Sequence, residues 1–269
     1  MRILFFGDVV GRSGRDALIE HLPRIHDRFT PDCVIVNAEN AAAGFGVTKS
    51  ICEDLYAAGV HVITTGNHVW DNTDILNAFQ SFKGLLRPAN FPQSSPGSGW
   101  TLYPIPIGKN QGKHILVINL MGRLFMDPLN DPFEIMEEIL QKYSLSSPST
   151  DAIFVDFHGE ATSEKQAFAA YFDGKISGVI GTHTHVPTAD TRILPQGTAF
   201  QTDAGMCGDY QSVIGMELST SFPKFLKRGP SKRMQVSSGE GTLFGVCIDV
   251  DDQTGKAIAV ERLQYGKSL

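Results

Sequence analysis

The sequence predicts an α/β protein in which two β-sheets pack together and helices lie outside them. Short apolar runs alternate with helical patterns through the first third of the chain, which is typical of parallel β-α-β units. Strand-like runs follow one another with little helix between them in the last third, which indicates further sheet pairing. A chain of 269 residues can bury about three-quarters of its unfolded surface, and we expect one domain over residues 1–269.

The elements of the first half have local signals. Thr48 is a suitable N-cap and Gly59 a suitable end for one helix, and a proline directly after Asp131 is typical of the start of another. Pro23 is expected to interrupt the first helix. The Pro-, Gly- and Ser-rich stretch 84–112 is predicted to be mainly a connection. The predicted strands are 3–6, 33–36, 60–65, 102–107 and 115–120, and the predicted helices are 15–29, 48–58 and 132–143.

The second half is predicted to contain one more helix and several strands. Ser163 and Gln166 have the spacing of a capping box at the start of a helix that ends near Phe172. Residues 251–255 are typical of a hairpin turn. The predicted strands are 152–157, 176–180, 192–194, 198–201, 243–250 and 257–263.

Composition and charge exclude several classes of protein. The chain is 42% hydrophobic and 19% charged, as expected for a globular protein, and no apolar run approaches the length of a membrane span. The apolar start ends at Gly7, too early for a signal peptide. None of the four cysteines forms a C-x-x-C pair, which favours a reduced, cytoplasmic setting. The net charge of −6 argues against a stable nucleic-acid partner but allows a small anionic ligand.

Side chains that can bind metals or exchange protons follow the predicted strands. Ligands of open α/β sheets bind beyond the carboxyl ends of the strands, so these residues are expected to meet in one place. His183 and His185 are two residues apart, and in extended chain both rings point to the same side. Burying such a set without a cation would be costly. The candidates are Asp8, Glu39, Asn40, Asn67, His68, His158, His183 and His185.

The donors other than His68 are more numerous than one ion needs, which predicts two metal ions with Glu39 as a bridge. Mixed imidazole and oxygen donors suit Fe, Mn, Zn or Co rather than Ca or Mg. Two divalent ions, the carboxylates of Asp8 and Glu39 and a bridging hydroxide would leave the site locally positive. The hydroxide could then attack a bound phosphate while His68 protonates the leaving alkoxide.

Several short motifs resemble those of the calcineurin-like metallophosphoesterases over nearly the whole chain. They are Gly7-Asp8, Asn37-Ala38-Glu39-Asn40, Gly66-Asn67-His68, Phe157-His158-Gly159 and Gly181-Thr182-His183-Thr184-His185. The resemblance is closest to the YmdB-like branch, which also matches Arg87-Pro88-Ala89-Asn90 and Thr202-Asp203-Ala204-Gly205-Met206. It implies a four-layer α-β-β-α sandwich of two mixed sheets.

The resemblance also implies how the donors divide. One metal would take Asp8, Glu39, Asn40 and His185, and the other would take Glu39, Asn67, His158 and His183. His68 would face the substrate as a general acid or a donor to the phosphoryl group. Val10 replaces the histidine of the usual Asp-x-His motif and Glu39 replaces the usual aspartate; the branch shares both changes, which implies that Asn40 fills the gap left by Val10.

The branch implies two divalent transition-metal ions, iron or manganese ahead of zinc or cobalt, and cyclic nucleotides as substrates. The 2′,3′-cyclic monophosphates would be preferred over the 3′,5′-cyclic ones. A phosphomonoesterase such as a nucleotidase or a protein phosphatase would use the same metals. The replacement at Val10 also leaves open a nucleotide-sensing regulatory protein with little turnover. A metallohydrolase that acts on non-phosphate substrates is a further alternative.

Some candidates have an equally simple structural explanation. Arg12 lies in a G-x-x-G turn that could bind a phosphate or only connect a strand to a helix, and Trp70 could stack on a base or pack internally. The basic segment 224–233 is predicted to be a solvated loop, with guidance of nucleotide phosphates as the alternative. Asp203 has no role that the sequence indicates. An exposed sheet edge in the second half would allow a homo-oligomer.

Overall fold

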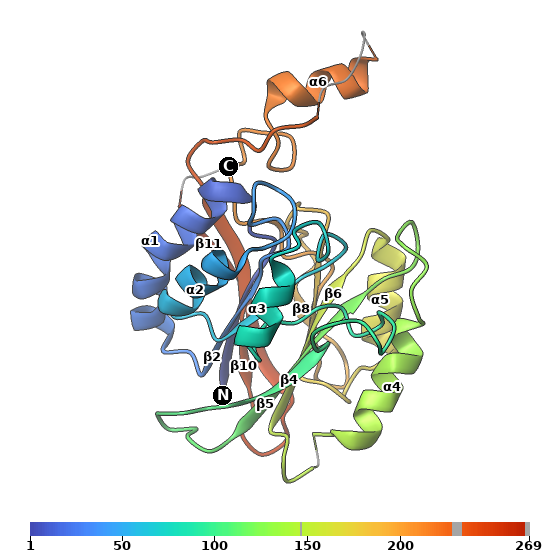
Figure 1. The fold of residues 1–269 in the computed structure, drawn as a ribbon. Helices are drawn as coiled ribbons and strands as arrows, with labels where there is room; N and C mark the ends of the chain where they lie inside the picture. Colours follow the sequence, from blue (N-terminus) through green and yellow to red (C-terminus); the bar gives the residue numbers. More distant parts are fainter. Residues whose placement is uncertain (146, 228–232, 267–269) are drawn as a thin grey trace.

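Two β-sheets lie face to face with helices on both outer sides (Figure 1). The computed structural model describes residues 1–145, 147–227 and 233–266. The first sheet has the order β11-β10-β1-β2-β3, with β1, β2 and β3 parallel and β10 and β11 antiparallel to their neighbours. Its strands are β1 (Arg2–Phe6), β2 (Cys33–Asn37), β3 (Val62–Thr64), β10 (Thr242–Val250) and β11 (Ala257–Gly266).

The second sheet has the order β4-β5-β6-β7-β9-β8. Four of its strands, β5, β6, β7 and β9, are parallel, and β4 and β8 pair antiparallel at the two edges. Both sheets are therefore mixed, as the resemblance implied. The strands are β4 (Trp100–Pro104), β5 (His114–Met121), β6 (Ala152–His158), β7 (Gly178–Thr182), β8 (Arg192–Ile193) and β9 (Ala199–Gln201).

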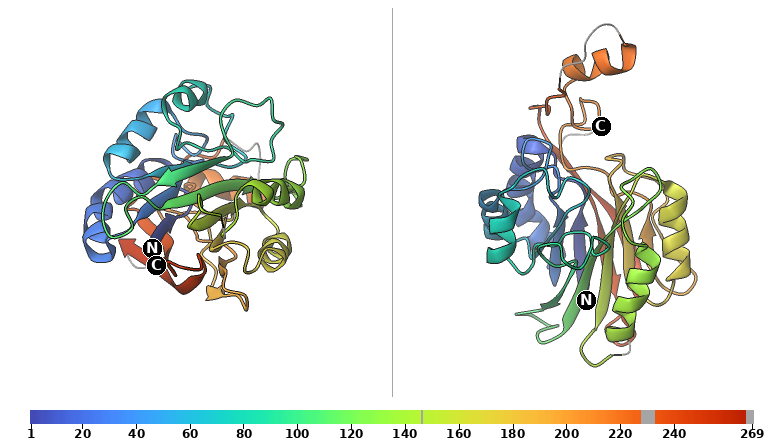
Figure 2. Two further views of the ribbon diagram at one scale, coloured as in Figure 1. Left: turned by 90° about the horizontal axis from the view of Figure 1, so that it is seen from below. Right: turned by 45° about the vertical axis from the view of Figure 1, so that its right-hand side comes forward.

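The helices complete a four-layer sandwich, which confirms the predicted fold class. Helices α1, α2 and α3 cover the first sheet, and α4 and α5 cover the second, as both views of Figure 2 show. Helix α6 belongs to neither layer. The bounds are α1 (Gly11–Phe29), α2 (Lys49–Ala57), α3 (Ile75–Ser81), α4 (Pro132–Lys142), α5 (Thr162–Tyr171) and α6 (Leu218–Leu226). Among the described residues, no helix is both long and apolar enough to cross a membrane.

The alternation of side chains along each strand separates three apolar cores. On β1, Ile3 and Phe5 point between the sheets, where the ring of Phe5 lies 5.0 Å from that of Phe154. Leu4 and Phe6 point the other way, against the helices of the first outer layer. Because both faces of the central strands are buried, these strands are mostly apolar, apart from Arg2 at the start of β1 and Asp156 within β6. The candidate donors lie at or beyond their carboxyl ends.

The structure corrects several local predictions. Helix α1 begins at Gly11 and runs through Pro23 without a break. The predicted capping box is wrong, because α5 begins at Thr162 after Ala161, which makes no side-chain cap. Helices α3 and α6 were not predicted, and β4 lies earlier than the expected strand 102–107. The caps at Thr48 and Asp131 are confirmed by hydrogen bonds from the amides of Ile51 and Phe133.

A protruding arm, defined as the described residues 209–227 and 233–240, carries α6 away from both sheets (Figure 1). It begins and ends where Gly208 pairs with Thr242. Val236 fixes its base, because a Cβ added at Gly11 would lie 2.4 Å from the Val236 side chain and one at Gly44 would lie 2.7 Å from it. The predicted loop over 224–233 is therefore wrong at its start, where Lys224 is helical, and residues 228–232 lie outside the described part of the chain.

Candidate metal centre

The predicted donors meet at the carboxyl ends of strands from both sheets. Asp8, Glu39 and Asn67 lie two or three residues beyond the ends of β1, β2 and β3 of the first sheet. His158 ends β6 and His183 follows β7 of the second sheet. The parallel direction of these strands places their ends at the same edge, so residues distant in sequence become neighbours.

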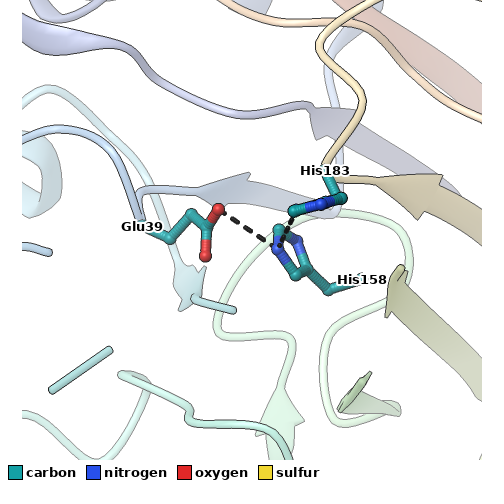
Figure 3. Close-up of side chains that lie close together, drawn as sticks. All are labelled: Glu39, His158 and His183. Atoms are coloured by element: carbon teal, nitrogen blue, oxygen red, sulfur yellow. Dashed lines mark hydrogen bonds and ion pairs between the residues drawn. The ribbon is translucent and has the colours of Figure 1, made fainter. Parts of the chain in front are cut away.

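One group of donors surrounds the Nε2 atom of His158. It lies 3.1 Å from Oε1 of Glu39, 2.9 Å from Oδ1 of Asn67 and 3.1 Å from Nδ1 of His183. Figure 3 shows Glu39 and His183 converging on one nitrogen of the His158 ring. Ligands held about 2.1 Å from one ion lie about 3 to 3.5 Å apart, so these separations suit a shared cation.

A second group contains Asp8, Glu39 and His185, whose ligand atoms lie within 4.8 Å of one another. Oδ1 of Asn40 lies 3.2 Å from Nε2 of His185 and so belongs to this group. Nδ1 of His185 faces the carbonyl oxygen of Ile214 in the arm at 2.8 Å, which leaves Nε2 for the donors. Val10 is buried and its side chain lies against the positions of Gly208 and Gly215, away from these donors.

Glu39 is common to both groups; Asp8, Glu39, Asn40, His158 and His185 are buried, whereas Asn67 and His183 are partly exposed. Oδ1 of Asp8 is also buried and accepts no hydrogen bond within the described structure. The nearest charged group is Nδ1 of His158, 3.7 Å away, and a buried carboxylate oxygen without a hydrogen bond is costly unless a closer cation compensates it. The donor set and this orphaned oxygen therefore fit metal ions.

Gly66 leaves the space in which the donors meet. A Cβ added there would lie 2.2 Å from Oε2 of Glu39 and 2.4 Å from Nε2 of His158. The φ angle of Gly66 is not positive. Glycine is therefore required here because a side chain would collide with the donors, not because of the backbone conformation. The turn of Gly66 is thus shaped around the donors.

Electrostatics couples the donors to one another. Burial raises the pKa of Asp8, although the nearby His185 and His158 oppose the change. Burial also disfavours the Glu39 carboxylate, but the charge and hydrogen bond of His158 outweigh it and lower the pKa of Glu39 to about 2. Burial and His158 lower the pKa of His183 to about 3. Burial alone would lower the pKa of His158, but Glu39 outweighs it and raises this pKa to about 9. Metal binding must therefore displace a proton from His158.

The carboxylate of Asp156 connects the strand ends that carry the donors. It is fully buried and accepts hydrogen bonds from Thr64 at 2.5 Å, from Asn37 at 2.9 Å and from Thr182 at 2.7 Å. Burial raises its pKa to about 7, against the effects of His158 and of these hydrogen bonds. This network connects the ends of strands in both sheets and keeps them in register.

His68 lies at the exposed side of the centre. Its backbone amide donates to Oε2 of Glu39 at 3.3 Å, and Nδ1 of its ring lies 2.8 Å from Oδ2 of Asp71. The ring meets Phe45 edge-on at 5.1 Å, and its side chain keeps 27% of its exposure. The Nε2 atom is the one that these contacts leave for a ligand.

The other candidates lie apart from the donors. Arg12 is exposed on α1, in grooves formed with residues such as Asp16 and Asp54, and the amide of Gly11 already donates to Asn40. Trp70 packs edge-on against Phe79 and Phe91. Substrate binding by Arg12 and Trp70 stays a prediction without support from these contacts.

Sequence reasoning missed the residues that hold the donors in place. Asp71 holds the ring of His68, and Glu160 lies 3.2 Å from Nε2 of His183. Asp156 could have been noticed as a carboxylate inside an apolar strand, since a buried charge in such a run needs a partner. The remaining supports are Thr64, Thr182 and Lys165, whose sequence context is ordinary.

Comparisons with known proteins find relatives that match nearly the whole chain. A family model described as YmdB-like protein matches residues 4–263. A Bacillus subtilis (strain 168) protein named 2′,3′-cyclic-nucleotide 2′-phosphodiesterase is 48% identical over 263 residues, which cover 98% of this chain and 96% of that protein.

Two solved structures are similar over all or nearly all of their lengths. A hypothetical protein from Thermus thermophilus has a TM-score of 0.90 and 39% identity, and the match covers 100% of both chains. A structure described as a novel phosphatase from Mycoplasma pneumoniae has a TM-score of 0.89 and 37% identity, with 99% of this chain and 93% of that chain covered.

The four-layer fold and the buried donors at its strand ends define a calcineurin-like metallophosphoesterase, that is, a phosphoesterase enzyme. Within this class, the chain belongs to the YmdB-like family.

Proposed function

We propose that this enzyme is a phosphodiesterase that uses two divalent transition-metal ions to hydrolyse small cyclic nucleotides. The 2′,3′-cyclic monophosphates are the preferred substrates, and the 3′,5′-cyclic monophosphates are hydrolysed less efficiently. The observation that carries the proposal is the position of Glu39, a buried carboxylate shared by two groups of imidazole and oxygen donors. The name of the Bacillus subtilis relative supports the choice of substrate.

The donors set the charge and identity of the metal site. Glu39 and Asp8 supply two negative charges, and Asn40 and Asn67 add neutral oxygens, so two divalent ions leave a positive site for a phosphate. Iron or manganese, and after them zinc or cobalt, suit this mixture of imidazole and oxygen. When bound, the ions would polarise the phosphoryl group and activate water.

The protein's own part in the reaction is to place a proton at the leaving group. Asp71 holds Nδ1 of His68, so that Nε2 can point at the substrate and donate to the departing alkoxide. The hydrogen bond from the His68 amide to Glu39 fixes the distance of this acid from the metal donors.

The first test measures metal content and substrate range together. Elemental analysis of the purified protein should find about two transition-metal ions per chain, as in other two-metal phosphoesterases. A panel of 2′,3′-cyclic, 3′,5′-cyclic and open nucleoside monophosphates should show the fastest turnover with the 2′,3′-cyclic substrates. Faster release of phosphate from open monophosphates would instead assign the enzyme as a phosphomonoesterase.

A variant of His68 separates an enzyme from a nucleotide sensor. His68→Ala should lower kcat by about 10²- to 10⁴-fold while the metal content stays the same. The matched control is His26→Ala, which removes an exposed histidine on α1 and should leave both unchanged. Turnover that survives His68→Ala would contradict the role given to His68.

A further inference from the structure

A buried ion pair lies beside the metal centre and belongs to neither group of donors. Nζ of Lys165, on α5, is 2.9 Å from Oδ2 of Asp203, and both side chains are fully buried. Removing two charges from water is costly, and further hydrogen bonds are needed to compensate it. The partners of this pair therefore indicate what it holds.

The further partners lie in the turn that carries His183 and His185 and in the adjacent segment 203–205. Nζ of Lys165 also donates to the carbonyl oxygen of Thr182 at 2.7 Å. Oδ2 of Asp203 accepts a hydrogen bond from the amide of Thr184 at 3.0 Å, and its Oδ1 accepts one from the amide of Gly205 at 2.9 Å. The pair is thus bound to the turn that presents His183 and to the segment 203–205 beside it.

This turn has a backbone conformation that needs support. His183 and His185 have φ angles of 99° and 65°, a region that residues other than glycine rarely adopt. Such conformations persist only where the surrounding structure holds them. The amide of His183 is held by Oδ2 of Asp8 at 3.1 Å, and that of Thr184, between the two histidines, is held by Asp203.

The carboxylate of Asp203 also contacts the segment that lies against Gly7 and Asp8. It fixes Gly205, whose carbonyl oxygen lies so close to Gly7 that a Cβ there would be 1.9 Å away. Gly7 directly precedes Asp8. One buried pair therefore connects α5 with both segments that carry the donors Asp8, His183 and His185.

We propose that Lys165 and Asp203 are positioning residues that hold residues 181–185 in the conformation that metal binding requires. They touch neither the metals nor the substrate. They act through the amide of Thr184 and the carbonyl group of Thr182, whose hydroxyl group contacts His158. This inference rests on the proposed metal centre but not on the identity of the substrate.

The test uses a double variant, because Lys165→Met alone would leave the Asp203 charge buried without a partner and could prevent folding. Lys165→Met combined with Asp203→Asn removes both charges and keeps an oxygen for Gly205. The control is Ser177→Ala, which removes another fully buried polar group that contacts backbone, at the opposite end of β7.

Two readouts distinguish positioning from stability. In chelated protein, the amides of His183 and Thr184 should exchange hydrogen faster in the double variant than in the wild type or the control. The Mn²⁺ dissociation constant should rise about 10- to 100-fold in the double variant only. Unchanged exchange and Mn²⁺ affinity, or a lower melting temperature alone, would overturn the proposal.

The wild type separately tests the function on which the inference depends. A wild type that binds Mn²⁺ but hydrolyses no cyclic nucleotide would refute the proposed substrate and leave the positioning role supported by the two readouts above. Exchange that is equal in all three proteins would refute the positioning role even if the wild type hydrolyses cyclic nucleotides.

Discussion

The ring of His158 is oriented by a buried hydroxyl group, because its Nδ1 atom lies 2.9 Å from Oγ1 of Thr182. Thr182 donates its own proton to Asp156 at 2.7 Å. The hydroxyl oxygen can then only accept from the ring, so Nδ1 keeps a proton, and Nε2 is the nitrogen that would bind a metal once its own proton is displaced. A residue that makes no contact with the metals thereby selects the form of His158 that can bind one.

Thr182→Val should weaken metal binding while the fold is preserved. Valine has nearly the shape of threonine but cannot accept from Nδ1, so the ring of His158 loses its fixed orientation and Asp156 loses a donor. We expect the Mn²⁺ dissociation constant, measured by calorimetric titration, to rise about 10- to 100-fold. Thr182→Ser keeps the hydroxyl group and should bind Mn²⁺ almost as the wild type does. Equal losses in both variants would contradict this account.

Gly66→Ala should abolish metal binding by filling the space between the donors. The added methyl group would lie 2.2 Å from Glu39 and 2.4 Å from His158, both of which are held by further contacts. Gly159→Ala is the matched control, because its Cβ would meet neighbours only at 3.5 Å or more although it directly follows His158. Elemental analysis after equilibration with Mn²⁺ should find about two ions in the control and fewer than one in Gly66→Ala. Full occupancy of Gly66→Ala would show that the donors can move aside.

The donors could be predicted from the sequence because one physical rule places them. Parallel strands of an α/β fold end at the same edge, so Asp8, Glu39 and His183 were expected to meet even though the chain separates them widely. The two-residue spacing of His183 and His185 predicts an extended backbone with both rings on one side. In the structure both residues instead have positive φ angles, and they approach different groups of donors.

The supports of the donors could not be predicted in the same way. Lys165 lies on a helix whose charged residues are expected to face solvent, and only the three-dimensional structure shows that it is fully buried against Asp203. Helix α6 does have a sequence signal, since Leu218, Phe222 and Phe225 follow the spacing of one helical face. The Gly229-Pro230 pair of the basic segment nearby favours a loop instead.

Removal of metal should lower the thermal stability of the enzyme. A ligand present at about 100 times its dissociation constant stabilises the folded state by about 2.7 kcal/mol per site, and without a cation the Oδ1 atom of Asp8 has no hydrogen-bond partner in the described structure. For a chain of this size, this corresponds to a fall in melting temperature of about 5 to 10 °C for each site emptied by EDTA, and about twice that for two sites. Mn²⁺ should restore the melting temperature and Ca²⁺ should not, because Ca²⁺ prefers oxygen ligands alone. Scanning calorimetry tests this, and identical melting with and without EDTA would argue against a metal centre.

The arm should contribute to substrate binding through Arg233. Its guanidinium group lies over the ring of Phe45, 4.9 Å from the centroid, and the same ring meets His68 edge-on. Arg233 thus places a positive charge near the acid proposed to protonate the leaving group, in a protein whose net charge is −6. A charge at this position attracts an anionic substrate equally before and during the reaction, so its loss should affect KM more than kcat.

We therefore expect Arg233→Ala to raise KM for a cyclic nucleotide about 5- to 10-fold, with kcat nearly unchanged and the difference from wild type reduced at high salt. Lys224→Ala removes an equally exposed positive charge from α6 and is the matched control, because no contact connects Lys224 to Phe45 in the described structure. Steady-state kinetics at two ionic strengths distinguish the cases. An equal rise in KM for both variants would show that the overall charge of the protein, and not the position of Arg233, causes the effect. An unchanged KM in Arg233→Ala would show that bound substrate does not reach the arm.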